Sequence, residues 1–155
     1  MGAPTVPAWV TVLSALLTPT IAILALLIAW QQWQTNRNKL KLDLFDRRYV
    51  YYEAARELIG RILTSGKATD AVTFEFLHKT RGAQFIVGEA IATYFDKELY
   101  SKAIDLNCLD AELQGVGVGP ERSENVRKQS EIKKWFNAQH KVLDDLFRAH
   151  LDLKH

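Results

Sequence analysis

The chain has 155 residues and a formal net charge of +2, from 20 lysines and arginines and 18 aspartates and glutamates. A charge this close to neutral excludes a surface built as a whole for nucleic acids or other polyanions. None of these ionic residues precedes Arg37. The composition therefore predicts two parts, an apolar N-terminal tail and helix over residues 1–36 and a charged globular domain over residues 37–155.

Residues 10–29 form an uncharged and mostly apolar stretch. About 20 helical residues, rising about 1.5 Å each, span the hydrocarbon core of a bilayer, which is about 30 Å thick. Trp9 lies at one end of the stretch, and Trp30 and Trp33 lie at the other. Tryptophan prefers the headgroup region. We therefore expect one N-terminal transmembrane helix.

Two other interpretations of this stretch are weaker. A secretory signal peptide carries a basic segment, then a short apolar core and a small-residue cleavage site. Here no basic side chain precedes the apolar residues, and the stretch ends in Trp-Gln-Gln-Trp. A buried helix of a soluble domain is disfavoured by the length of the uncharged run.

Basic residues follow the apolar stretch, and none precedes it. They are Arg37, Lys39, Lys41, Arg47 and Arg48. Positive charge near a membrane helix favours the cytoplasmic side. We therefore expect a protein of the bacterial inner (plasma) membrane, with the N-terminus outside and the C-terminal domain in the cytoplasm.

Small or weakly polar residues recur at every third or fourth position along this helix. Such residues let membrane helices approach closely, so the stripe predicts a pore lining or a helix–helix interface in a homo-oligomer. The alternative is that lipid simply tolerates alanine and threonine. The residues of this stripe are Thr11, Ser14, Thr18, Ala22, Ala25, Ala29, Gln32 and Asn36.

The second part is predicted to be helical throughout. Apolar residues step by three or four positions in each segment, and glycines separate the segments. The Gly-rich segment 115–124 is interpreted as a connector, because it lacks the lysine of a phosphate-binding loop. The fold class is therefore all-α, with one transmembrane helix followed by a small cytoplasmic domain of about four helices. Their expected ranges are 42–65, 71–79, 88–113 and 125–153.

The sequence shows no catalytic constellation, so we do not expect an enzyme. The single cysteine, Cys108, excludes an intramolecular disulfide, and no Cys/His spacing matches a zinc site. His140 and Asp144 lie four residues apart, but a lone pair on a lysine-rich helix is more simply a solvated surface. We expect neither a metal nor a cofactor.

Three arginines are candidates for holding an anion, because a guanidinium can bind a phosphate through two hydrogen bonds. They are Arg47, Arg48 and Arg81, the last of which follows His78 and Lys79. The alternative is that Arg47 and Arg48 pair with Asp43 and Asp46 on the helix surface.

The stretch from Ile28 to Ile62 resembles a group of small bacterial single-pass membrane proteins. The residues that carry the resemblance are Gln31-Gln32-Trp33, Asn38-Lys39-Leu40-Lys41 and, above all, Leu42-Asp43-Leu44-Phe45-Asp46-Arg47-Arg48 followed by Tyr49. Residues 85–89 read Phe-Ile-Val-Gly-Glu, a partial match to Phe-Leu-Phe-Gly-Glu in the group. Some members look like the membrane effectors of antiphage systems of the Hailong type.

In those systems a nucleotidyltransferase partner makes an oligonucleotide that controls an oligomeric membrane channel. The resemblance therefore implies a homo-oligomeric, pore-forming effector, gated through its cytoplasmic domain by an oligonucleotide or a protein partner. The residues themselves leave a second interpretation, a membrane-tethered helical adaptor that recruits a cytoplasmic protein. Stoichiometry separates the two, because a pore needs several helices around an axis and a tether needs one.

Overall fold

The computed structural model describes residues 7–152, except for the side chains of residues 8, 11–15 and 18. All regular structure in this range is helical and no strand occurs in it, so the all-α prediction is confirmed. The chain divides into two units, residues 1–43 and residues 44–155. Helix α1 (Ala8–Ser65) contributes residues to both units.

In the first unit, α1 exposes large apolar side chains on all sides. Leu26 is 71% exposed and Trp30 is 61% exposed, and the isoleucines and leucines between residues 16 and 28 are exposed to similar extents. No helix built from the described residues is long and apolar enough to cross a membrane. Residues 11–15 and 18 of the uncharged stretch are not among the residues whose side chains the structure describes.

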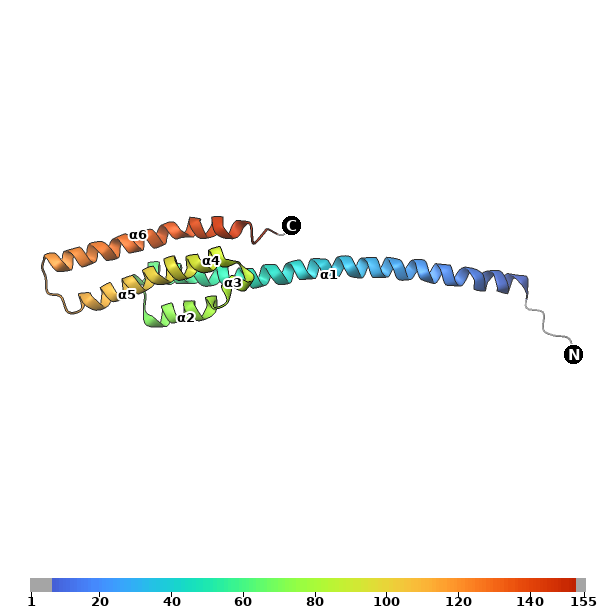
Figure 1. Ribbon diagram of the computed structural model, residues 1–155, viewed down its shortest axis with the longest axis horizontal. Coiled ribbons are helices and arrows are strands. Elements are labelled where there is room, and N and C mark those ends of the chain that lie inside the picture. The colour runs from blue at the N-terminus through green and yellow to red at the C-terminus, as the bar shows by residue number, and fades with distance from the viewer. Residues whose placement is uncertain (1–6, 153–155) are drawn as a thin grey trace. The chain divides into compact units, whose positions relative to one another are not determined.

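The second unit contains the C-terminal part of α1 and all the later helices (Figure 1). The helices α4, η1 and α5 follow one another without a break and form one helical run. The expected helices over 71–79 and 88–113 are therefore confirmed within one residue at each end. The elements are α2 (Asp70–Thr80), α3 (Ala83–Ile86), α4 (Glu89–Thr93), the π-helix η1 (Tyr94–Tyr100), α5 (Ser101–Leu113) and α6 (Pro120–Arg148).

Helix α6 begins and ends about five residues earlier than predicted. Pro120 occupies the first turn, where its missing N–H leaves no bond unmade and its fixed φ suits a helix. At the other end, the amides of His150 and Leu151 both donate to the carbonyl of Phe147, and this turn closes the helix. The expected range 125–153 was wrong. The helix starts at Pro120, which lies within the Gly-rich segment 115–124 that was interpreted as a connector.

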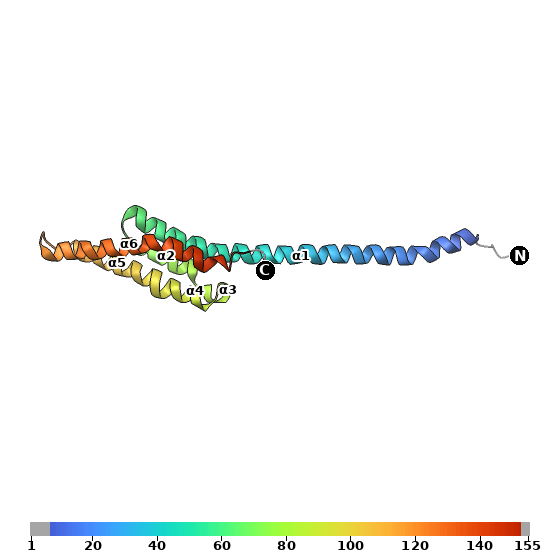
Figure 2. The same cartoon turned by 90° about the horizontal axis from the view of Figure 1, so that it is seen from above.

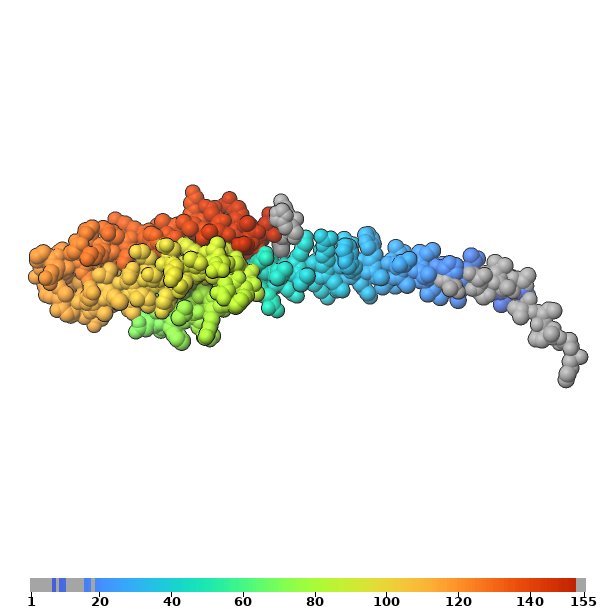
Figure 3. All heavy atoms as spheres, viewed as in Figure 1, coloured from blue at the N-terminus to red at the C-terminus, as the bar shows by residue number. Residues whose placement is uncertain are grey.

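Buried side chains from every helix of the second unit form one core. Helix α6 returns beside the α4–η1–α5 run, and the space-filling view shows it lying against that run (Figures 2 and 3). The largest fully buried members are Leu58, Ile59, Ile62, Ile91, Leu99, Leu106, Phe136, Leu143 and Phe147.

Three polar side chains of α6 are buried where it meets the α4–η1–α5 run, and each is hydrogen-bonded. Asn125 donates to the carbonyl of Leu109 at 3.0 Å and accepts from Gln129 at 2.9 Å. Gln139 accepts from the hydroxyl of Tyr94 at 2.9 Å. Burial of the ring, and then the charge of nearby Glu98, raise the pKa of Tyr94 far above its usual value. These bonds fix the position of α6 along the α4–η1–α5 run.

Candidate functional site

A pocket of about 430 Å³ lies between α2, α3 and the α4–η1 run. Its volume is within the range of pockets that hold small molecules. We call it the α2–η1 pocket. Its aromatic lining consists of Phe74, Phe76, Phe95 and Tyr100, and its titratable lining consists of His78, Arg81, Glu89, Asp96 and Lys97, besides Tyr100.

Helix α2 supplies one wall of the pocket. Phe76 is buried and anchors the helix in the core, and the hydroxyl of buried Thr80 donates to the carbonyl of Phe76 at 2.8 Å. After Arg81 the chain turns at Gly82, whose φ of 85° is a conformation that glycine adopts without strain. The turn leaves His78 and Arg81 at the pocket and leads into α3.

The π-helix η1 supplies the opposite wall, with Phe95, Asp96, Lys97 and Tyr100. π-Helical turns are rare and are found frequently at functional sites. The ring of Phe95 packs edge-on against Phe76 at 5.7 Å and stacks on Phe147 at 6.1 Å. Phe76 and Phe95 therefore belong both to the pocket lining and to the core of the unit.

The charges that line the pocket are nearly balanced. Arg81 and Lys97 are opposed by Glu89 and Asp96, and Lys97 Nζ lies 3.6 Å from Asp96 Oδ2. His78 adds an imidazole, which can form hydrogen bonds. The lining therefore combines aromatic side chains with both acidic and basic side chains. A simple anion site, in contrast, is lined by basic groups alone.

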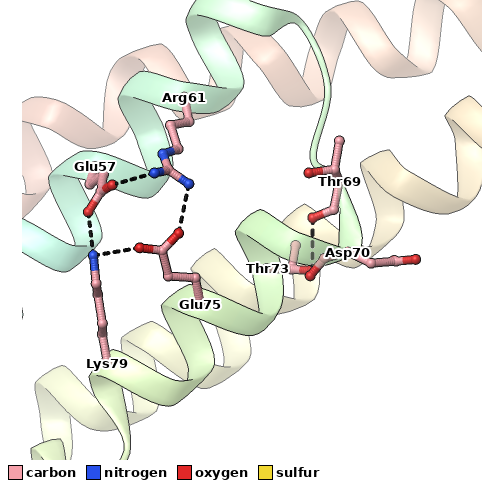
Figure 4. Close-up of polar contacts among 7 residues, drawn as sticks. All are labelled: Glu57, Arg61, Thr69, Asp70, Thr73, Glu75 and Lys79. Atoms are coloured by element: carbon pink, nitrogen blue, oxygen red, sulfur yellow. Dashed lines mark hydrogen bonds and ion pairs between the residues drawn. The ribbon is translucent and has the colours of Figure 1, made fainter.

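On its other side, α2 is joined to α1 by a closed ring of four ion pairs (Figure 4). Arg61 lies 2.9 Å from Glu57 and 2.7 Å from Glu75, and Lys79 lies 2.7 Å from Glu57 and 2.8 Å from Glu75. The hydrogen bond to Lys79 is the main reason that the pKa of Glu75 lies below its usual value. Bonds to Glu57 and then Glu75 raise the pKa of Lys79.

The structure separates the three arginines that the sequence singled out. Arg81 lines the α2–η1 pocket, whereas Arg47 and Arg48 are not among its lining residues. Arg47 is exposed on α1. No ion pair within the described residues includes either of these two arginines, so the alternative of surface pairs with the nearby aspartates is not realised.

Arg48 points to the C-terminal end of α6. Its Nη1 donates to the carbonyl of His150 at 3.0 Å, and its Nε is buried without a hydrogen-bond partner among the described residues. Burial, and then the charge of Arg48, lower the pKa of His150. One turn along α1, the hydroxyl of Tyr52 donates to Asp144 at 2.7 Å, and this bond is the main reason that the pKa of Tyr52 is raised. These contacts hold α1 against α6.

The small-residue stripe lies in the first unit, within α1. Ala22, Ala25, Ala29, Gln32 and Asn36 are exposed there. The other three members of the stripe, Thr11, Ser14 and Thr18, have side chains outside the described residues.

Two features of the pocket were missed from the sequence. Lys79, which is close in sequence to His78 and Arg81, takes part in the ion-pair ring and does not line the pocket. The wall formed by η1 was expected to be ordinary α-helix. One signal was present, because the buried residues Ile91, Phe95, Leu99 and Ala103 recur at every fourth position. Four α-helical residues turn about 40° past a full circle, so a spacing of four stays on one face only if the turn is wider.

In the part of the chain that the structure describes, no three His, Cys, Asp or Glu residues are grouped to hold a metal ion. Asp144, which was considered with His140 as a pair, is bonded to Tyr52. Compared with known protein families, curated proteins and solved structures, the chain shows no match.

Proposed function

We propose that the chain is a homo-oligomeric membrane effector, anchored by the N-terminal part of α1 and controlled by a ligand in the α2–η1 pocket. The observation that carries the proposal is the apolar surface of α1 in the first unit. The side chains of Trp9, Trp30 and Trp33 are more than half exposed, and so are those of the leucines and isoleucines from Leu16 to Ile28. A helix that is apolar on all sides is stable only in an apolar environment, such as lipid.

The arrangement of charge supports the same anchor and its direction. The uncharged residues 10–29 are long enough for a bilayer, and basic residues follow them. We therefore place the N-terminus outside the bacterial inner membrane and the second unit in the cytoplasm.

The exposed stripe of small residues supports assembly. Ala22, Ala25 and Ala29 offer no bulk, so a second α1 can pack closely along them, and Gln32 and Asn36 continue the stripe with polar groups. Several copies around one axis would place these residues at the interface or along a pore. Membrane lipid and further copies of the chain are the partners that this arrangement requires.

The α2–η1 pocket supports control by a ligand. Arg81 offers a guanidinium for a phosphate, and the aromatic lining offers surface for a flat ring. The resemblance of residues 28–62 points to an oligonucleotide made by a nucleotidyltransferase partner, in antiphage defence. Such a ligand gates a pore only if the open and closed states bind it with different affinity.

The test is ion flux through liposomes that contain the purified full-length chain. A short oligonucleotide should change the flux, and Arg81→Gln should weaken the response, while Arg127→Gln on α6 should leave it unchanged. Arg127 is a matched control because it is exposed and its ion pairs with Glu124 and Glu131 lie within one helix. A chain that remains monomeric in nanodiscs, or liposomes that never conduct, would overturn the pore.

The exposed aromatic side chains near the pocket favour a second candidate, the membrane-tethered adaptor. Phe74 is 69% exposed, and Phe85, which lies beside Gly82 of the pocket, is 80% exposed. Exposed aromatic rings next to a pocket are typical anchors for a protein partner. A monomer that captures a defined cytoplasmic protein, with capture lost in Phe74→Ser, would favour the adaptor over the pore.

A further inference from the structure

The ion-pair ring joins α2, which lines the α2–η1 pocket, to α1, which does not line it. Glu57 and Arg61 come from α1, and Glu75 and Lys79 come from the C-terminal half of α2 (Figure 4). Each of the four charged groups has two neighbours of opposite sign. Removal of any one therefore breaks two ion pairs and leaves the other three groups with an unbalanced charge.

The N-terminal half of α2 is attached by different means. Asp70 accepts a hydrogen bond from Asn107 of α5, and Thr73 donates its hydroxyl to the carbonyls of Thr69 and Asp70. Lys67, just before α2, pairs with Asp110 of α5 at 3.0 Å. None of these contacts holds the last two turns of the helix, where Glu75 and Lys79 lie.

Those last turns also form the wall of the α2–η1 pocket. His78 and Arg81 line the pocket, while their neighbour Lys79 reaches the ring. Phe76 anchors the same turns in the core and Thr80 is buried at their end, so the ring acts together with these two side chains to hold this half of the helix. Loosening the ring should therefore free the C-terminal half of α2, which forms the pocket wall, and leave α5 and α6 in place.

We infer that the ring of Glu57, Arg61, Glu75 and Lys79 is a salt-sensitive latch that holds the C-terminal half of α2, and with it one wall of the α2–η1 pocket, on α1. The side chains of the ring are between 35% and 46% exposed, so dissolved ions reach them and screen the attraction. The latch operates whatever the pocket binds, and it does not depend on the proposed pore.

Hydrogen exchange of the full-length chain in detergent, read by mass spectrometry, tests the latch. In Lys79→Gln at low salt, the amides of the C-terminal half of α2 should exchange about two- to fivefold faster, the range expected for exposed ion pairs. In about 1 M salt, where the screening length is about 3 Å, the wild type should approach the variant. The variant keeps the Arg61–Glu75 pair, so it should respond less to salt than the wild type, and peptides from α5 and α6 should be unchanged.

Two further variants keep the test decisive. Glu57→Gln breaks the two ion pairs of Glu57 and so opens the same ring from the α1 side; it should loosen the same amides of α2. Arg127→Gln breaks exposed ion pairs within α6 and should leave α2 unchanged. Unchanged exchange in α2 in both ring variants would overturn the latch. Equal acceleration across α5 and α6, or an effect of Arg127→Gln on α2, would also overturn it, because the ring would then have no local action.

Discussion

Replacing Phe147 with alanine is expected to destabilise the second unit severely. Phe147 is 1% exposed, and its ring lies 5.5 Å from that of Tyr52 on α1 and 6.1 Å from that of Phe95 on η1. The side chain therefore joins three helices at one point. Removing a buried phenylalanine costs about 3–5 kcal/mol, because apolar burial is lost and a cavity remains. Domains of this size have a total stability of only about 5–15 kcal/mol.

Urea and thermal unfolding of the full-length chain in detergent, followed by circular dichroism, measure this loss. For a domain of this size each 1 kcal/mol lowers the melting temperature by about 4–8 °C, so the variant should melt at least about 12 °C lower. Phe85→Ala is the matched control, because Phe85 is 80% exposed and its removal should change stability by less than about 0.5 kcal/mol. Equal losses in the two variants would refute the packing described for α6.

Three smaller changes test other contacts. Tyr94→Phe should lower the free energy of unfolding by about 1–3 kcal/mol in the same urea assay, because buried Gln139 loses its donor; an unchanged midpoint would mean that the bond is not made. Asn125→Ala should cost a similar amount, because it removes the bond to the carbonyl of Leu109. His150 has a lowered pKa, so the unfolded chain takes up a proton first as the pH falls below about 6.5. Stability should therefore fall as the pH drops through about 6.5, and His150→Gln should remove this part of the pH dependence.

Much of the helical layout could be read from the sequence, because its signals are local. Gly66 ends α1 next to the predicted position, and the glycines at 82 and 88 separate α2 from the long run that follows. Each of these three glycines has a positive φ, which other residues adopt only with strain. The start of α6 was misplaced because Pro120 lies inside a segment rich in glycine. Glycine favours a loop, whereas proline favours the first turn of a helix.

The long-range contacts between helices could not be read in the same way. Lys79 and Glu57 are 22 residues apart, and Arg48 and His150 are 102 residues apart. Which charged residues meet depends on how each helix is rotated about its axis, and the apolar pattern fixes that rotation only coarsely. The sequence therefore supplied Arg81 as a candidate but did not separate it from Arg47 and Arg48.

The π-helical turn over Tyr94–Tyr100 makes the number of residues in this segment matter. An α-helical residue rotates the chain by about 100°, and a residue of the wider π-helical turn rotates it by less, so changing the number of residues here would change the rotation of everything beyond it. Leu109 would then shift relative to α6, and Asn125 would lose the carbonyl of Leu109 to which it donates. We therefore expect homologous chains to differ in the side chains of this segment but not in its number of residues, because that number sets the rotation of α5 relative to α4 about the helix axis.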